Sequence, residues 1–245
     1  MEESKHQESK ICGKHASRAL VSKRPGDIVR VFVLDTMTPE FGDLLKYCAD
    51  QHLPYRVVGS AELEKVSGAR HHEGICVVAR AKEAAPLSDV LAPKGAGLVL
   101  ALDDVSNPHN IGTLLRTAAH FGARAVLVGG PLRRLSSAAF RTAEGAAEHV
   151  DVLFAEDLAP LLEQCKGAGF AICATSSYKG RSLYEQPIPE RVCILLGSEK
   201  TGLSEQLSSL AEQHLRIPGT KAVESLNVAS SAAALLAEHW RCHRC

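Results

Sequence analysis

Apolar residues occur along the chain in short runs separated by amphipathic segments, which is the pattern of alternating strands and helices. The first third contains three apolar runs and two helical patterns: strands are predicted over 28–34, 55–58 and 75–79, and helices over 40–52 and 61–66. Residues 81–97 are rich in Ala, Pro and Gly, so we interpret them as a linker with one helical turn. We therefore predict a small α/β domain over 11–80, preceded by a polar, disordered tail over 1–10.

A second alternating series follows the linker. The predicted strands cover 98–102, 125–128, 150–154, 170–174 and 192–196, and the predicted helices cover 111–121, 137–142, 157–165 and 225–240. Strands that alternate with helices favour a mainly parallel sheet covered by helices on both faces. We predict one α/β domain over 98–245.

Composition narrows the class of protein. The chain has 245 residues, 45% of them hydrophobic, which is enough for a sizeable core. Lys plus Arg and Asp plus Glu both number 28, which excludes a nucleic-acid binder that works by net charge alone. Aromatic residues make up 4%, so few rings are present for base stacking.

The cysteines and apolar stretches indicate a cytoplasmic protein. Eight cysteines are scattered along a chain too large to need disulfides, and we interpret them as free thiols. The pair Cys242 and Cys245 lacks the second ligand pair of a structural zinc site, so no metal is predicted. The first residues have no apolar stretch and no 18-residue apolar window occurs, so we expect neither a signal peptide nor a membrane span.

Three segments of the second series carry candidate chemistry. The first, 103–112, follows a predicted strand and leads into a helix with Arg116; open α/β sheets bind ligands at such strand ends. The second, 194–203, is an apolar strand that runs into a loop with Gly197 and Gly202, where a backbone can approach a ligand closely. In the third, 217–229, a Ser-Leu-Asn sequence opens a helix. Taken singly, these features also fit ordinary helix capping and a solvated arginine.

Taken together, in this order and spacing, the three segments resemble the motifs of the SpoU (TrmH-like) family, within the SPOUT class of knotted RNA ribose 2′-O-methyltransferases. The matching positions are Asn110, Gly112 and Arg116 in the first motif, Gly197, Glu199 and Gly202 in the second, and Ile217, Pro218 and Ser225 to Val228 in the third. The resemblance spans residues 98–240, and Ala143 to Ala146 resemble an intervening family segment.

The resemblance also implies a fold and an assembly. It implies that the C-terminal parallel sheet is tied in a trefoil knot. Residues 13–20 and 72–75 stand in an order similar to the family's ribosomal-protein-like RNA-binding domain, which would be the N-terminal α/β domain. The family works as a homodimer with its final helix in the interface. The run of small residues from Ala229 to Ala234 and the apolar Leu235, Leu236 and Trp240 suit that role.

The activity implied is transfer of a methyl group from S-adenosylmethionine to a ribose 2′-hydroxyl of rRNA or tRNA. By the same resemblance the catalytic residues would be Asn110, Arg116, Glu199, Ser225 and Asn227. The cofactor-binding residues would be Thr175, Leu196, Gly197, Gly202, Ile217 and Leu226. Arg133 and Arg134, at a predicted strand end, are candidate RNA contacts. We expect Arg116 to bind phosphate or stabilise negative charge, because a guanidinium is a poor base.

Two positions depart from the family pattern. Lys221 stands where the third motif usually has Gly, and Ala229 stands where it usually has Ser. Two alternatives stay open: a non-catalytic RNA-binding or assembly protein on the same fold, which these departures favour, and a SPOUT methyltransferase that acts on a base. The Ser225 and Asn227 pattern favours ribose over a base.

Overall fold

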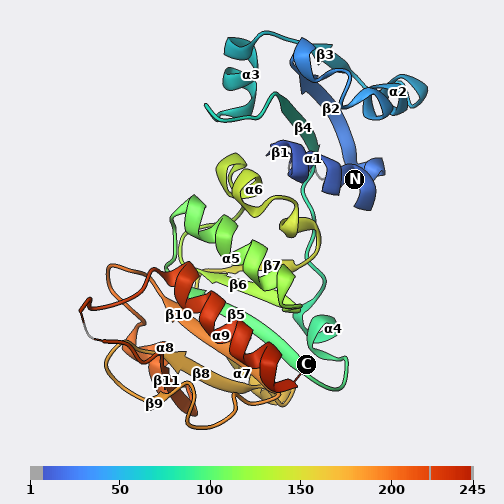
Figure 1. Cartoon of the computed structure of the whole chain (residues 1–245). Coiled ribbons are helices and arrows are strands. Elements are labelled where there is room, and N and C mark those ends of the chain that lie inside the picture. The colour runs from blue at the N-terminus through green and yellow to red at the C-terminus, as the bar shows by residue number, and fades with distance from the viewer. Residues whose placement is uncertain (1–7, 221, 244–245) are drawn as a thin grey trace. The chain divides into compact units, whose positions relative to one another are not determined.

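The computed structural model describes residues 8–220 and 222–243, which fold into two compact units (Figure 1). The first unit comprises residues up to Glu83 together with Leu135–His149, and the second comprises Ala84–Arg134 and the chain from Val150 onward. The chain therefore passes between the units three times.

The first unit is built on a four-stranded sheet in the order β1-β4-β2-β3. Its strands are β1 (Glu8–Cys12), β2 (Ile28–Val33), β3 (Tyr55–Val57) and β4 (Ile75–Arg80). Its helices are α1 (Lys14–Lys23), α2 (Gly42–Asp50) and α3 (Ser60–Ser67), with short 3-10 turns η1 (Pro25–Asp27) and η2 (Asp35–Met37). Strand β4 runs antiparallel to β1 and β2, whereas β2 and β3 are parallel.

A segment from the middle of the chain completes this unit. It contains α6 (Ser137–Ala143) and η3 (Ala146–Glu148), which pack against α1 and β1. The Glu148 carboxylate accepts two hydrogen bonds from the Arg24 guanidinium, at 2.8 and 3.0 Å. The side chain of Glu148 is only 3% exposed, so this ion pair is almost fully buried.

The second unit is built on a parallel seven-stranded sheet in the order β7-β6-β5-β10-β8-β11-β9. The strands are β5 (Gly97–Asp103), β6 (Ala125–Gly129), β7 (Asp151–Ala155), β8 (Ala171–Thr175), β9 (Arg181–Ser182), β10 (Arg191–Gly197) and β11 (Gln213–Arg216). Strands β5 and β10 are central and almost wholly buried, which explains their unbroken apolar sequences.

Helices cover both faces of this sheet. They are α4 (Leu87–Leu91), α5 (Pro108–His120), α7 (Ala159–Gly167), α8 (Glu205–Ser209) and α9 (Val228–His243). Apolar side chains of α4, α7 and α8 share one core cluster with alternate residues of the central strands. Helices α5 and α9 pack against each other along the sheet (Figure 1). The predicted parallel sheet with helices on both faces is confirmed.

The structure moves several predicted boundaries. Residues 8–10, placed in the tail, form part of β1; residues 1–7 lie outside the described residues. Residues 84–97, placed in the linker, belong to the second unit, because Leu87, Val90 and Leu91 are buried in its core. Residues 135–149, placed in the C-terminal domain, belong to the first unit, because their apolar face packs against α1 and β1.

Candidate functional site

The three candidate segments meet at one edge of the second sheet. Because β5, β10, β8 and β11 are parallel, the loops that follow them leave the sheet at the same edge. Asn110 follows β5 at the start of α5, Glu199 follows β10, and Asn227 lies between β11 and α9. Local signals set the start of α5: Pro108 occupies its first turn, and the Asn107 side chain accepts a 2.9 Å hydrogen bond from the backbone N–H of His109.

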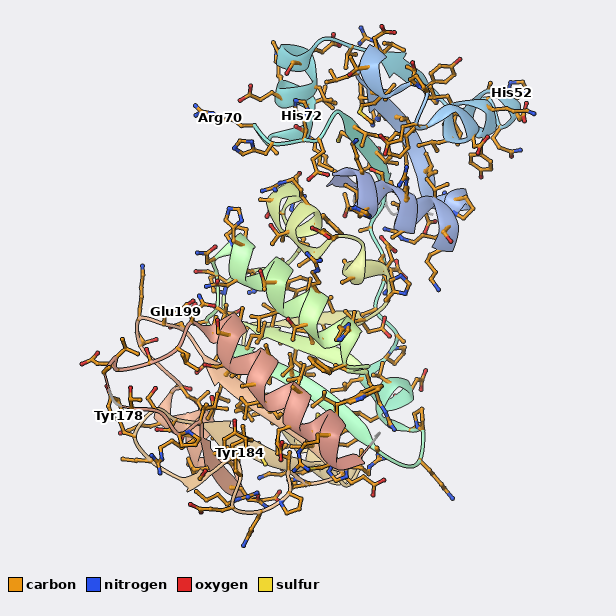
Figure 2. The ribbon with its side chains drawn as sticks, in the orientation of Figure 1. His52, Arg70, His72, Tyr178, Tyr184 and Glu199 are labelled. Carbon is orange, nitrogen blue, oxygen red and sulfur yellow. The ribbon has the colours of Figure 1, made fainter. Side chains whose placement is uncertain are left out.

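A hydrogen-bonded triad joins these loops. The Glu199 carboxylate accepts hydrogen bonds from the amide groups of Asn110 and Asn227, the latter at 3.3 Å. The Asn227 amide also donates to the Asn110 side-chain oxygen at 3.1 Å. The Asn227 side-chain oxygen accepts from the backbone N–H of Ala229 at 2.9 Å and so caps α9 (Figure 2 shows Glu199 near the start of this helix). The expected meeting of Asn110, Glu199 and Asn227 is thus present in the structure.

The loop after β10 is closed so tightly that only glycine fits at its start. A Cβ atom on Gly197 would overlap the backbone of Gly202 and Leu203. Gly202 has φ +69°, a left-handed conformation that favours glycine. Ser198 holds the turn: its backbone oxygen accepts from the Gly202 N–H at 2.9 Å, and its hydroxyl lies 2.8 Å from that of Thr201. The two predicted glycines therefore shape this wall of the site.

Two further side chains, Thr175 and Asp103, hold the strand ends and the glycine loop in place. The Thr175 hydroxyl, at the end of β8, donates a 2.8 Å hydrogen bond to the Leu195 carbonyl oxygen and ties β8 to β10. Asp103, at the end of β5, accepts a 2.8 Å hydrogen bond from the Ser204 N–H and holds the far side of the glycine loop. Asp103 begins the first candidate segment but was not predicted as a site residue, although a carboxylate directly after a buried strand is a usable signal.

The other predicted residues take varied positions. Leu196 is buried within β10, and Ile217 lies partly exposed directly after β11. Ser225 and Leu226 are exposed in the segment before α9; the predicted helix start at Ser225 is wrong, because the cap is Asn227. Arg116 is exposed on α5, about 9 Å along the axis from Asn110 and about 120° around it.

The candidate RNA contacts Arg133 and Arg134 are both exposed. The Arg133 guanidinium donates to the carbonyl oxygens of Gly130 and Leu132, and to Glu156 at 3.2 Å. Part of its donor capacity is therefore used within its own turn. Lys221 lies outside the described residues.

Residues 8–220 and 222–243 hold no group of three or more His, Cys, Asp or Glu suited to a metal. None of the described helices combines the length and apolar character needed to cross a bilayer. The seven described cysteines are free, and burial raises the pKa of the Cys173 thiol, on β8, to about 12. This thiol is therefore no nucleophile at neutral pH.

Comparison with known proteins identifies both parts of the chain. Residues 97–237 match the SpoU rRNA methylase family, and residues 10–85 match the family described as RNA 2′-O ribose methyltransferase substrate binding. An uncharacterised tRNA/rRNA methyltransferase of Escherichia coli O157:H7, YfiF, is 36% identical over 96% of this chain and 68% of its own length.

Solved structures agree. An RNA 2′-O ribose methyltransferase is 26% identical with a TM-score of 0.79, and the alignment covers 96% of this chain and 89% of that one. The methyltransferase AviRb of Streptomyces viridochromogenes, solved with S-adenosylmethionine, shares the fold with a TM-score of 0.80 at 19% identity, over 96% and 90% of the two chains. The α/β fold and the polar strand-end site define a SPOUT-type protein. The chain belongs to the SpoU rRNA methylase family.

Proposed function

We propose that this protein transfers a methyl group from S-adenosylmethionine to a ribose 2′-hydroxyl of rRNA or tRNA. The observation that carries the proposal is the triad of Asn110, Glu199 and Asn227, which joins all three family motifs at the ligand-binding edge of a parallel sheet. Family membership and the substrate-binding match of residues 10–85 support RNA as the substrate.

The residues present fit S-adenosylmethionine. The loop at Gly197 and Gly202 presents backbone with little side-chain bulk, and the following loops offer Ile217 and the 48% exposed Leu226 as apolar surface. Backbone groups of these loops would hold the adenosyl part. When bound, the cofactor supplies a methyl group already activated on a sulfonium.

The chain's own residues would then orient the acceptor. Glu199 is fixed by two amide donors, so its carboxylate has a set direction and one oxygen left to accept a further hydrogen bond, such as that of a ribose hydroxyl. Holding the hydroxyl in one direction favours in-line transfer, because the reaction then needs little further ordering.

Arg116 would act on charge rather than as a base. A guanidinium has five donors and no acceptor, and its planar fork suits a phosphate oxygen pair. From an exposed position on α5 it can bind the phosphate beside the target nucleotide and stabilise the negative charge that develops on the attacking 2′-oxygen as that oxygen loses its proton. Ser225, in the exposed segment before α9, would be a second polar contact to the acceptor.

The Ala229 departure does not disturb the triad. Asn227 caps α9 by accepting a hydrogen bond from the backbone N–H of residue 229. Every residue type except proline has this N–H, so Ala229 serves as well as the usual Ser. The alternatives of a non-catalytic protein and of a base methyltransferase stay as outcomes for experiment.

Several expectations stay predictions. They are the trefoil knot, RNA contacts at Arg133 and Arg134, the cytoplasmic location and the homodimer. For the dimer, Leu235 and Leu236 are buried within the protomer, so the surface available from α9 centres on its smaller residues and the half-buried Trp240.

Calorimetric titration with S-adenosylmethionine, followed by transfer of labelled methyl groups to total RNA, tests the proposal. We expect binding and transfer by the wild type and by Gly167→Ala, a position with open space around its Cβ. Gly197→Ala should lose cofactor binding, because its methyl group overlaps the loop backbone. A wild-type protein that neither binds the cofactor nor methylates RNA would support the non-catalytic alternative.

A further inference from the structure

The loop after β8 carries an exposed aromatic ring, that of Tyr178. Tyr178 is 74% exposed, the highest value among the large apolar and aromatic side chains that the structure leaves exposed. It lies three residues past the end of β8, in a loop that none of the three family motifs includes. Most of the surface of this side chain is therefore available to a ligand.

The turn that carries Tyr178 is firmly held. The Ser176 hydroxyl accepts hydrogen bonds from the backbone N–H groups of Tyr178 and Lys179, at 3.2 and 3.0 Å. The Ser176 N–H donates to Leu215 of β11 at 3.0 Å. Gly180 has φ +100°, and a Cβ there would overlap the His214 backbone, so the turn lies directly on β11. A rigid turn presents the ring without a large entropic cost on binding.

Sheet order places this turn at the same edge of the sheet as the triad, because β8 and β10 are parallel. Strand β8 is the direct neighbour of β10, and β11, on which the turn lies, is two strand spacings from β10, or about 10 Å. Figure 2 shows both residues on the same side of the second unit. Tyr184, 64% exposed, follows β9, which is three strand spacings from β10, or about 14 Å.

We propose that Tyr178 stacks on an unpaired nucleobase of the RNA next to the methylated nucleotide, with Lys179 beside it to contact the phosphate. The inference rests on the proposed function, since it takes RNA as the substrate. Stacking on a rigid aromatic ring tolerates any base, so Tyr178 fixes the path of the strand rather than reading its sequence. It makes single-stranded or unpaired RNA the substrate class at this site.

The test compares Tyr178→Ala, Tyr178→Phe and Tyr184→Ala. Affinity for a fluorescent single-stranded oligouridylate and for S-adenosylmethionine is measured for each, with KM and kcat for methylation of total RNA. We expect Tyr178→Ala to bind the oligouridylate about 5-fold to 100-fold more weakly and to raise KM for RNA, with unchanged cofactor affinity. Tyr178→Phe keeps the ring and should match the wild type, as should Tyr184→Ala.

The outcomes separate this inference from the proposed function. Unchanged RNA affinity in Tyr178→Ala overturns the stacking role, even where methyl transfer is intact. Lost cofactor affinity with unchanged RNA affinity also overturns it, since the ring would then contact the adenine of the cofactor. If the wild type transfers no methyl group, the proposed function fails, whereas weaker oligouridylate binding by Tyr178→Ala still supports the contact.

Discussion

The side-chain amide of Asn227 donates a 3.1 Å hydrogen bond to the side-chain oxygen of Asn110, although 117 positions separate the two residues. The same Asn227 side chain caps α9 through its oxygen. One residue therefore links the start of the last helix to the start of α5 and to Glu199.

Substitutions of Asn227 should separate capping from site chemistry. Asn227→Asp keeps an oxygen for the Ala229 N–H, but it removes the amide donor and sets a second carboxylate beside Glu199. We expect methyl transfer to fall by more than about 10-fold with a stability change under about 1 kcal/mol, because aspartate is a good cap. Asn227→Ala should lose activity and about 1 kcal/mol of stability. Thermal unfolding and methyl transfer measure the two effects, and full activity in Asn227→Asp would contradict the role of the triad.

Replacement of Arg116 tests its charge role. Arg116→Lys keeps the positive charge but loses the planar pair of donors that matches a phosphate. We expect most of the methyl-transfer activity to be lost, with cofactor affinity unchanged. Methyl-transfer turnover and the calorimetric affinity for S-adenosylmethionine are measured on the same preparation. Near-normal turnover would remove Arg116 from the mechanism.

The buried ion pair of the first unit should dominate its stability. Arg24→Met leaves the Glu148 carboxylate buried without its partner, so we expect a loss of about 3–5 kcal/mol in the free energy of unfolding. Arg30→Met is the matched control: Arg30 pairs with Glu8, but the two side chains are 44% and 41% exposed, so the loss should stay below about 1 kcal/mol. Urea unfolding measures both, and equal losses would refute the assignment.

Asp27 should make the same unit acid-sensitive. Burial acts to raise the pKa of the Asp27 carboxyl group, but hydrogen bonds from Arg80 and Arg24 outweigh it and hold that pKa below its ordinary value. A lowered pKa adds stability above the unfolded value of about 3.9, and this is lost as pH falls through the folded pKa. The stability difference between the wild type and Asp27→Asn should be constant above about pH 5 and shrink toward pH 2. A difference independent of pH would contradict the ion pairing.

Much of the second sheet could be predicted from the sequence because its central strands are buried on both faces. Strands β5, β6, β8 and β10 lie within one residue of their predicted ends. Strands β9 and β11 were missed because they are short and polar, with Leu215 as the only fully buried residue of β11. Helix α1 was missed because its buried face consists of only Ala16, Ser17 and Leu20.

The site was predictable only as far as its motifs reach. Asn110, Glu199 and Asn227 were found by resemblance, and the structure joins them. The sequence could not predict that residues 135–149 belong to the first unit. Their placement depends on Arg24, which is far away along the chain, and on packing against α1. Likewise, the exposure of Tyr178 follows from the turn at Ser176 and Gly180, which no pattern of apolar residues reveals.

The most direct measurement identifies the methylated atom. RNA methylated by the protein with labelled S-adenosylmethionine is hydrolysed in alkali, which requires a free 2′-hydroxyl at each cleaved linkage. Methyl transfer to the ribose predicts label in alkali-resistant dinucleotides, which yield a 2′-O-methyl nucleoside on enzymatic digestion. Label in mononucleotides that carry a methylated base would contradict it.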